Sequence, residues 1–171
     1  LTMSISFVSC QEEQQNTIGE NELEFKLSED EKYYTVVSIG NCTDTNVIIP
    51  EEYNGLPVTV IGERAFYNSD ITSVVIPDTV VNVLSGAFMA CTKLKTVKLG
   101  NSVTNIFGMA FSGCTSLEEI NFPDSIEMLG DRTFENCTSL KVVNIENAEG
   151  LKTIGAKAFN NCTSIEKIKL P

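Results

Sequence analysis

Six cysteines carry the widest chemical repertoire in this chain: Cys10, Cys42, Cys91, Cys114, Cys137 and Cys162. A thiol can act as a nucleophile, bind a metal ion or form a disulfide. Nucleophilic catalysis needs a base beside the thiol, and the 171-residue sequence contains no His, the commonest general base and metal ligand. No two cysteines form a Cys-x-x-Cys pair either. We therefore predict no catalytic residue, no metal site and no cofactor, and we do not expect an enzyme.

The spacing of the cysteines indicates a repeated structural position. The last four follow one another at steps of 23, 23 and 25 residues, and each comes three residues after a phenylalanine. These phenylalanines, together with one that precedes them, are Phe66, Phe88, Phe111, Phe134 and Phe159. Free Cys packs as a small hydrophobe, so this spacing favours a row of buried free thiols over a disulfide framework. The first copy has Ser69 in place of the thiol, and we extend the prediction of a buried thiol to Cys42, which has a similar Cys-Thr context.

A short strand follows each of these positions. Leu94, Val97 and Leu99 form an L-x-x-V-x-L pattern that recurs in every copy, and its last two apolar residues flank an outward one, which is the period of a β-strand. A second apolar pair follows, and then a glycine near the phenylalanine: Gly62, Gly86, Gly108, Gly130 and Gly155. We interpret this last stretch as a single helical turn or tight corner, in which Gly supplies an unusual backbone angle.

Units of this kind bury their apolar faces by stacking, because a single unit has too little mass to cover them. The sequence thus predicts a mainly β leucine-rich-repeat solenoid of about five coils of about 23 residues, with one continuous parallel sheet and short helical turns. Residues 61–171 would form the repeats. Residues 23–60 would form an N-terminal β cap with a degenerate first coil.

The repeat resembles a known family. The stretch FSGCTSLEEINFPDSI, from Phe111 to Ile126, is similar to the BspA-type leucine-rich repeat of bacterial and protozoan surface proteins. The resemblance covers about residues 47–171, and the segment before it looks like the lead-in that such proteins carry. It implies a surface-displayed, adhesion-like protein that binds a host or neighbouring-cell protein.

The first 22 residues suggest export. Phe7, Val8, Ser9 and Cys10 resemble the lipobox of a bacterial lipoprotein, and the acidic run that follows resembles the surface-export tether of Bacteroidetes lipoproteins. Residues 1–9 would then be a residual signal peptide, residues 10–22 a flexible tether, and Cys10 the lipidation site at the outer membrane or cell surface. A plain secretory signal and an arbitrary fragment end are the alternatives.

The outward positions of the main strands form the candidate binding face. Two columns run down the predicted sheet. One holds Ser73, Thr96, Glu119, Val142 and Lys167, and the other holds Val75, Lys98, Asn121, Asn144 and Lys169. The alternative is a solubilising surface with cross-strand ion pairs, each worth under about 1 kcal/mol.

The predicted function is a cell-surface binding or adhesion module with a protein partner. The formal net charge of −11 argues against nucleic acid, and no apolar run reaches the length of a membrane-spanning helix, so a membrane would be contacted only through the lipid anchor. The alternative function is a structural spacer or scaffold for a domain beyond Pro171.

Overall fold

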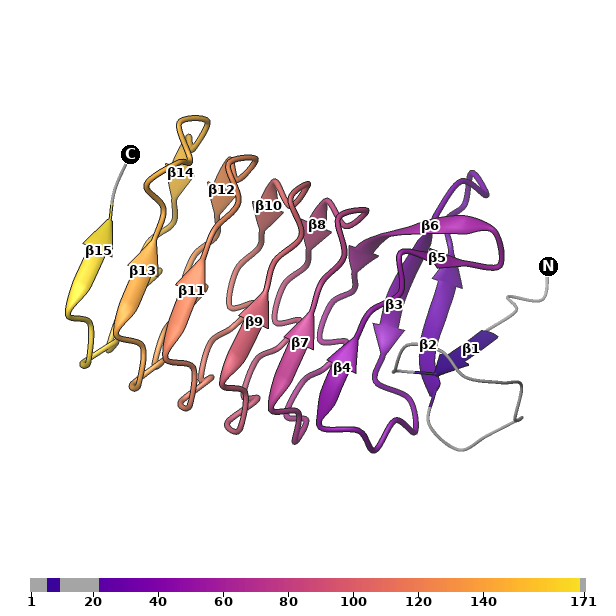
Figure 1. The fold of residues 1–171 in the computed structure, drawn as a ribbon, viewed down its shortest axis with the longest axis horizontal. Coiled ribbons are helices and arrows are strands. Elements are labelled where there is room, and N and C mark those ends of the chain that lie inside the picture. The colour runs from indigo at the N-terminus through magenta and orange to yellow at the C-terminus, as the bar shows by residue number, and fades with distance from the viewer. Residues whose placement is uncertain (1–5, 10–21, 170–171) are drawn as a thin grey trace.

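A computed structural model describes residues 6–9 and 22–169, which form a right-to-left stack of β coils in Figure 1. The described residues contain strands and turns and no helix, so the mainly β solenoid is confirmed. The corners that were expected to be helical turns or tight corners are the latter.

One side of the solenoid carries the main strands. They are β4 (Asn46–Ile48), β7 (Ser73–Val75), β9 (Thr96–Lys98), β11 (Glu119–Asn121), β13 (Val142–Asn144) and β15 (Lys167–Lys169). All pairs are parallel and in register, so equivalent residues of successive coils lie side by side. In β4, β7, β9, β11 and β13 the middle residue is buried in the core, whereas Ile168 of the last strand, β15, is 46% exposed.

These strands do not form the one continuous sheet that was expected. They form two three-stranded sheets, β4-β7-β9 and β11-β13-β15, which abut between β9 and β11. The amide of Lys141 donates to Glu118 O at 2.8 Å, whereas the structure gives the Glu118 amide no backbone acceptor in the preceding coil among the described residues. The ladder is thus interrupted at one coil junction.

We attribute the interruption to a large side chain. Phe122 occupies the last inward strand position, where Ile76, Leu99 and Ile145 stand in other coils, and its ring lies edge-on to the Phe134 ring at 5.8 Å. The core is slightly opened there: Leu99 is 8% exposed and Phe122 9%, while Ile76 and Ile145 are 1% exposed. A bulkier ring in a close-packed stack separates the two backbones.

Another side of the solenoid carries a nine-stranded sheet, called the second sheet below, which is continuous with the N-terminal cap. Its order is β1-β2-β3-β6-β8-β10-β12-β14, with β5 paired to β6. The cap strands are β1 (Ser6–Ser9), β2 (Glu22–Leu27), β3 (Tyr34–Ser38), β5 (Glu52–Tyr53) and β6 (Leu56–Ile61). The coil strands are β8 (Asn82–Val83), β10 (Asn105–Ile106), β12 (Met128–Leu129) and β14 (Thr153–Ile154).

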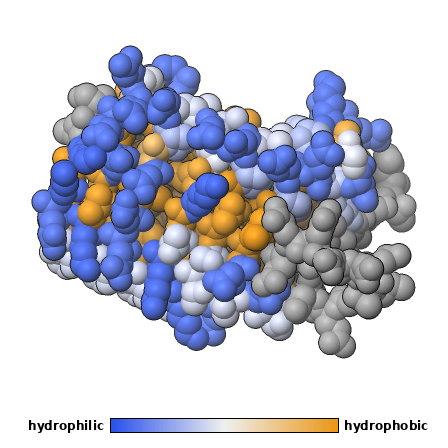
Figure 2. All heavy atoms as spheres, in the orientation of Figure 1, coloured by the Kyte–Doolittle hydropathy of each residue, from blue (hydrophilic) through white to orange (hydrophobic). Residues whose placement is uncertain are grey.

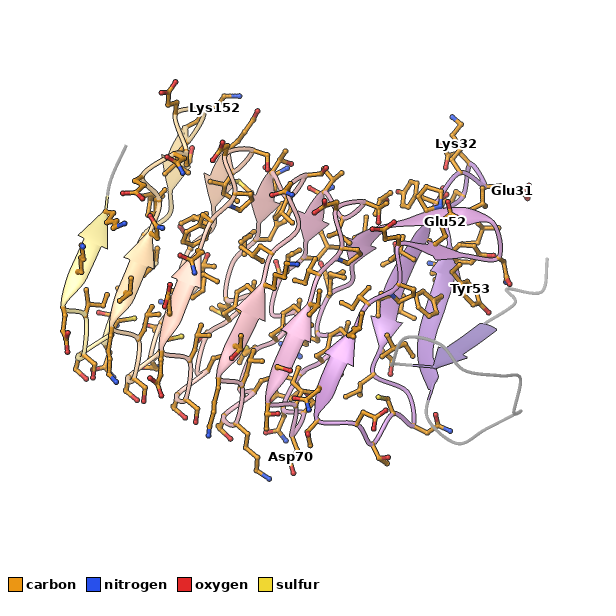
Figure 3. The ribbon with its side chains drawn as sticks, in the orientation of Figure 1. Glu31, Lys32, Glu52, Tyr53, Asp70 and Lys152 are labelled. Carbon is orange, nitrogen blue, oxygen red and sulfur yellow. The ribbon has the colours of Figure 1, made fainter. Side chains whose placement is uncertain are left out.

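The cap closes the core with aromatic rings. Tyr53, which Figure 3 labels, lies in this cap. Its ring stacks on Phe25 at 4.5 Å and meets the edge of Tyr34 at 4.8 Å. The β5–β6 hairpin that carries Tyr53 turns at Asn54 and Gly55, with φ of 48° and 78°. Asn-Gly suits this turn because both residues must adopt left-handed angles.

A column of phenylalanines forms the centre of the core. Phe66, Phe88, Phe111, Phe134 and Phe159 stack in sequence, with ring centroids 4.9, 5.1, 5.2 and 5.5 Å apart and planes within 10° of parallel. The first four are 0% exposed. The repeated spacing therefore aligns one ring per coil along the axis.

Each corner is a series of turns with two left-handed residues, two positions before and two after the phenylalanine. Around Phe66 these are Arg64 and Asn68, with φ of 53° and 55°. The expected role of glycine is wrong for most coils, since of the five corner glycines only Gly86 has a positive φ. Gly155 serves close approach instead: a Cβ there would lie 2.4 Å from the backbone nitrogen of Asp131 in the preceding coil.

The four repeat cysteines are free thiols, as predicted, and Cys91, Cys114 and Cys137 are buried, whereas Cys162 in the last coil is only partly buried. Each donates to the carbonyl of the phenylalanine in the preceding coil, at 2.9 Å for Cys91 to Phe66 and 3.2 Å for Cys114 to Phe88. Ser69 heads the column, with its hydroxyl 3.3 Å from the Cys91 sulfur. The prediction of a free thiol at Cys42 is wrong because Cys42 is disulfide-bonded. It lies in the lead-in before the repeats, where the stacking argument does not apply.

Candidate protein-binding face

The structure brings the ten predicted face residues together. Thr96 and Lys98 flank the buried Val97 of β9, and the same arrangement recurs in every main strand except β15, whose middle residue Ile168 is exposed. The register places Ser73 beside Thr96, and Glu119 beside Val142 and then Lys167, and the second column is aligned in the same way. Whether these residues bind a partner stays a prediction.

Polar contacts link part of the face. The Asn144 amide donates to Asn121 Oδ1 at 3.2 Å, and the Asn121 amide donates to Glu119 Oε1 at 2.8 Å. Lys98 is exposed and forms no ion pair with any described residue. The face therefore presents an ordered amide pair beside an unpaired ammonium group, both accessible to a partner.

The first strand of this face, β4, was not among the predicted face positions. β4 pairs with β7 in register, so Ile48 lies beside Val75, and both are half-buried. Asn46 Oδ1 accepts hydrogen bonds from Ser73 at 2.8 Å and Thr72 at 3.1 Å. Figure 2 shows hydrophobic surface in the middle of this side of the molecule, surrounded by hydrophilic side chains. The Asn-Val-Ile sequence of β4 was a usable signal, since it aligns with Ser-Val-Val of β7.

Ion pairs between coils surround the face. Lys93 pairs with Asp70 at 2.8 Å, Lys141 with Glu118 at 3.4 Å, and Lys169 with Glu146 at 3.0 Å. Figure 3 shows Asp70 and Lys152 projecting from opposite edges of the solenoid. These side chains are largely exposed, so each pair contributes under about 1 kcal/mol to stability. Lys169 is thereby engaged within the chain, which favours the solubilising role for this one predicted face residue.

The described residues offer no group of three or more potential metal ligands from His, Cys, Asp and Glu. The buried thiols are poor nucleophiles, because burial raises the pKa of Cys91 and Cys114 above the ordinary 9.0. What the face can do chemically is bind: it combines outward amides, a free ammonium group and a small apolar area. The predicted lipidation site, Cys10, lies outside the described residues.

The repeat geometry agrees with comparisons to known proteins. A family model described as the BspA type leucine rich repeat region matches six copies over residues 59–171. The chain belongs to this family. The six copies exceed the predicted five coils by one. Solenoids of this family are typical of protein-interaction and surface proteins, because stacked coils give a broad regular surface.

Solved structures of bacterial relatives share the fold. The T. pallidum leucine rich repeat protein is 29% identical over 87% of this chain and 69% of its own, with a TM-score of 0.78. A leucine-rich repeat protein from Bacteroides capillosus is 33% identical over 75% of this chain and 96% of its own, with a TM-score of 0.64. The pneumococcal vaccine antigen PcpA shares the fold at 23% identity over 94% of this chain and 43% of its own, with a TM-score of 0.68.

No curated protein matches the chain. Within the described residues there is no helix with the length and apolar character needed to cross a membrane.

Proposed function

We propose that this BspA-type chain is a surface-displayed module that binds a protein partner through the main-strand face. The observation that carries the proposal is the register of the main strands, which aligns outward side chains from successive coils on one broad side. The contact area would centre on Lys98 and the Asn121–Asn144 amide pair, with the apolar pair Ile48 and Val75 beside them. Amides and an ammonium group give hydrogen bonds, and the apolar pair gives buried area.

The proposed partner is a protein on a host or neighbouring cell, and the proposed location is the exported side of the membrane. The disulfide at Cys42 supports export, because disulfides persist in oxidising compartments. Adhesion would follow from display of the face on the cell surface.

The test compares two sets of alanine substitutions in the full chain. The face set is Lys98→Ala, Asn121→Ala and Asn144→Ala. The control set is Lys152→Ala, Asn82→Ala and Asn105→Ala, which also removes one lysine and one inter-coil asparagine pair (2.9 Å) but away from the main strands. Both sets are measured against partners selected from an array of secreted and surface proteins.

We expect the face set to weaken binding at least about ten-fold and the control set to leave it unchanged, since polar interface contacts contribute about 1–2 kcal/mol each when truncated. Equal affinities for the two sets would contradict the proposed face. A spacer function, the alternative expected from the sequence, predicts that neither set changes the behaviour of the chain toward any protein on the array.

A further inference from the structure

A hollow of about 390 Å³ lies on the turn side of the first coils, away from the main-strand face. Its lining comes from the corner segments that precede Phe66, Phe88 and Phe111, and from Met89 just after the second of these. The lining residues are Glu63, Arg64, Ser85, Gly86, Met89, Gly108 and Met109. It is therefore built from three successive coils at the same height.

The hollow exists because two coils have small residues where their neighbours have large ones. At the two positions before the Ala-Phe pair, the first coil has Glu63 and Arg64. The next coil has Ser85 and Gly86, and the third coil has Gly108 before Met109. The missing side-chain volume leaves a floor of backbone between a charged wall and a thioether wall.

Arg64 lies against an aromatic ring but has no ion-pair partner among the described residues. Its guanidinium lies 5.7 Å from the centre of the Tyr67 ring, and its stem lies over Gly86, where a Cβ would be 3.3 Å from Arg64 Cγ. Arg132 stands at the same position three coils later and lies 3.9 Å from Glu135. Among the described residues Arg64 has neither an ion pair nor a side-chain hydrogen bond, so an oriented cation with free donors faces the hollow.

The other side of the hollow is adaptable and apolar. Met89 and Met109 line it, and Met109 is 37% exposed. Tyr67, beside Arg64, is 50% exposed. Tyr, Met and Arg are the residue types enriched in the buried centres of protein interfaces. Thioether side chains adjust their shape to an incoming apolar group.

We propose that this hollow is a second interaction site, which takes an extended protein segment with an acidic side chain next to a large apolar side chain. The carboxylate would pair with the free Arg64 guanidinium, which suits a planar two-oxygen acceptor. The apolar neighbour would lie between Met89 and Met109 over the glycine floor. Glu63 at the rim offers an acceptor for a backbone amide of the segment. This proposal does not depend on binding by the main-strand face, and each of the two sites is tested by its own experiment.

The test uses capped nonapeptides and the full chain labelled with ¹³C at the methionine methyl groups. The first peptide has Glu-Leu-Phe at its centre in a Gly-Ser background, with both ends blocked, and the second has Gln in place of Glu. A third lacks the internal acid and ends in Leu with a free carboxylate. The methyl signals of Met89 and Met109 report on the hollow, while Met128 in β12 serves as the internal reference.

We expect the Glu peptide to shift the signals of Met89 and Met109 and not that of Met128. Loss of the carboxylate, or Arg64→Gln, should weaken this binding at least about ten-fold, the scale of a charge-assisted contact. Ser85→Phe, which fills the hollow from an exposed position, should abolish it. Arg132→Gln, the matched change outside the hollow, should leave it unaltered.

Three results would overturn the proposal. The first is no shift of either methyl signal at about 1 mM of the Glu peptide. The second is equal binding by the Arg64→Gln and Arg132→Gln variants. The third is tighter binding of the peptide with the free C-terminal carboxylate, which would assign the hollow to a chain end instead of an internal acidic side chain. None of these results depends on the main-strand face, which the alanine sets test.

Discussion

Replacing Phe111 by Ala should destabilise the protein severely, because this ring lies in the middle of the phenylalanine column. Phe111 is 0% exposed, and it stacks on Phe88 at 5.1 Å and on Phe134 at 5.2 Å. Burial of a Phe that is truncated to Ala is worth about 3–5 kcal/mol, and each stacked pair adds about 0.5–1.5 kcal/mol beyond its buried area. We therefore expect a loss near the upper end, about 4–5 kcal/mol.

Phe107→Ala is the matched control. Phe107 belongs to the same coil and is half-buried, but it stands outside the column. Partial burial predicts a loss of about 1–2 kcal/mol. Urea unfolding followed by far-ultraviolet circular dichroism measures the free energy of unfolding of both variants. Each kcal/mol lost from this free energy lowers the Tm by about 2–4 °C in a chain of this size. Equal losses for the two variants would refute the reasoning that the stacked column dominates the core.

Three further results are expected. Burial raises the pKa of the Cys114 thiol above the ordinary 9.0, so the unfolded chain loses this proton at lower pH than the folded protein. The contribution of this thiol to the free energy of unfolding is therefore fully present below pH 9 and falls as the pH rises above 9. Urea titrations at about pH 8 and about pH 10 should show that fall, and Cys114→Ala should reduce it by up to about 1.4 kcal/mol per pH unit. Hydrogen exchange should be faster at the Glu118 amide than at the equivalent amide of the next coil, and Phe122→Leu should slow it by letting the two sheets approach; equal rates in the parent protein would contradict the interruption. Peptide mapping without reduction should find Cys42 in a disulfide; a peptide that links it to Cys10 would contradict lipidation, because a thioether to lipid leaves no thiol at that residue.

The stacked core and the strand columns were predictable from spacing alone. A repeat of constant length gives every coil the same backbone path, so equivalent residues such as Lys98 and Asn121 must share one side. The row of thiols followed for the same reason, with Ser69 correctly placed at its head. The family resemblance added the same fold from the quoted motif, and the family match confirmed it.

Features that depend on contacts between coils were not predictable in the same way. The interruption between β9 and β11 depends on the volume of one ring, Phe122, against its neighbours. The left-handed corner positions take Arg64 in one coil and Gly86 in the next, so glycine does not mark them. The prediction of a free thiol at Cys42 was wrong because Cys42 shares the Cys-Thr dipeptide with the repeats but lies before them. The sequence does contain a sign of the hollow, namely the small residues Ser85, Gly86 and Gly108 in successive coils. These residues indicate a hollow only once the register of the coils is known.

The most direct test of the central claim is site-specific photocrosslinking from the main-strand face. A photoreactive phenylalanine analogue is placed at Asn121 in one sample and at Asn105 on the second sheet in another, and the full chain is displayed to the partner identified on the array. Both sites are asparagines in inter-coil amide pairs, so the two substitutions are matched in local chemistry. Binding through the main strands predicts a covalent adduct from the Asn121 site and none from the Asn105 site. An adduct from Asn105 alone would contradict the account and place the partner on the second sheet.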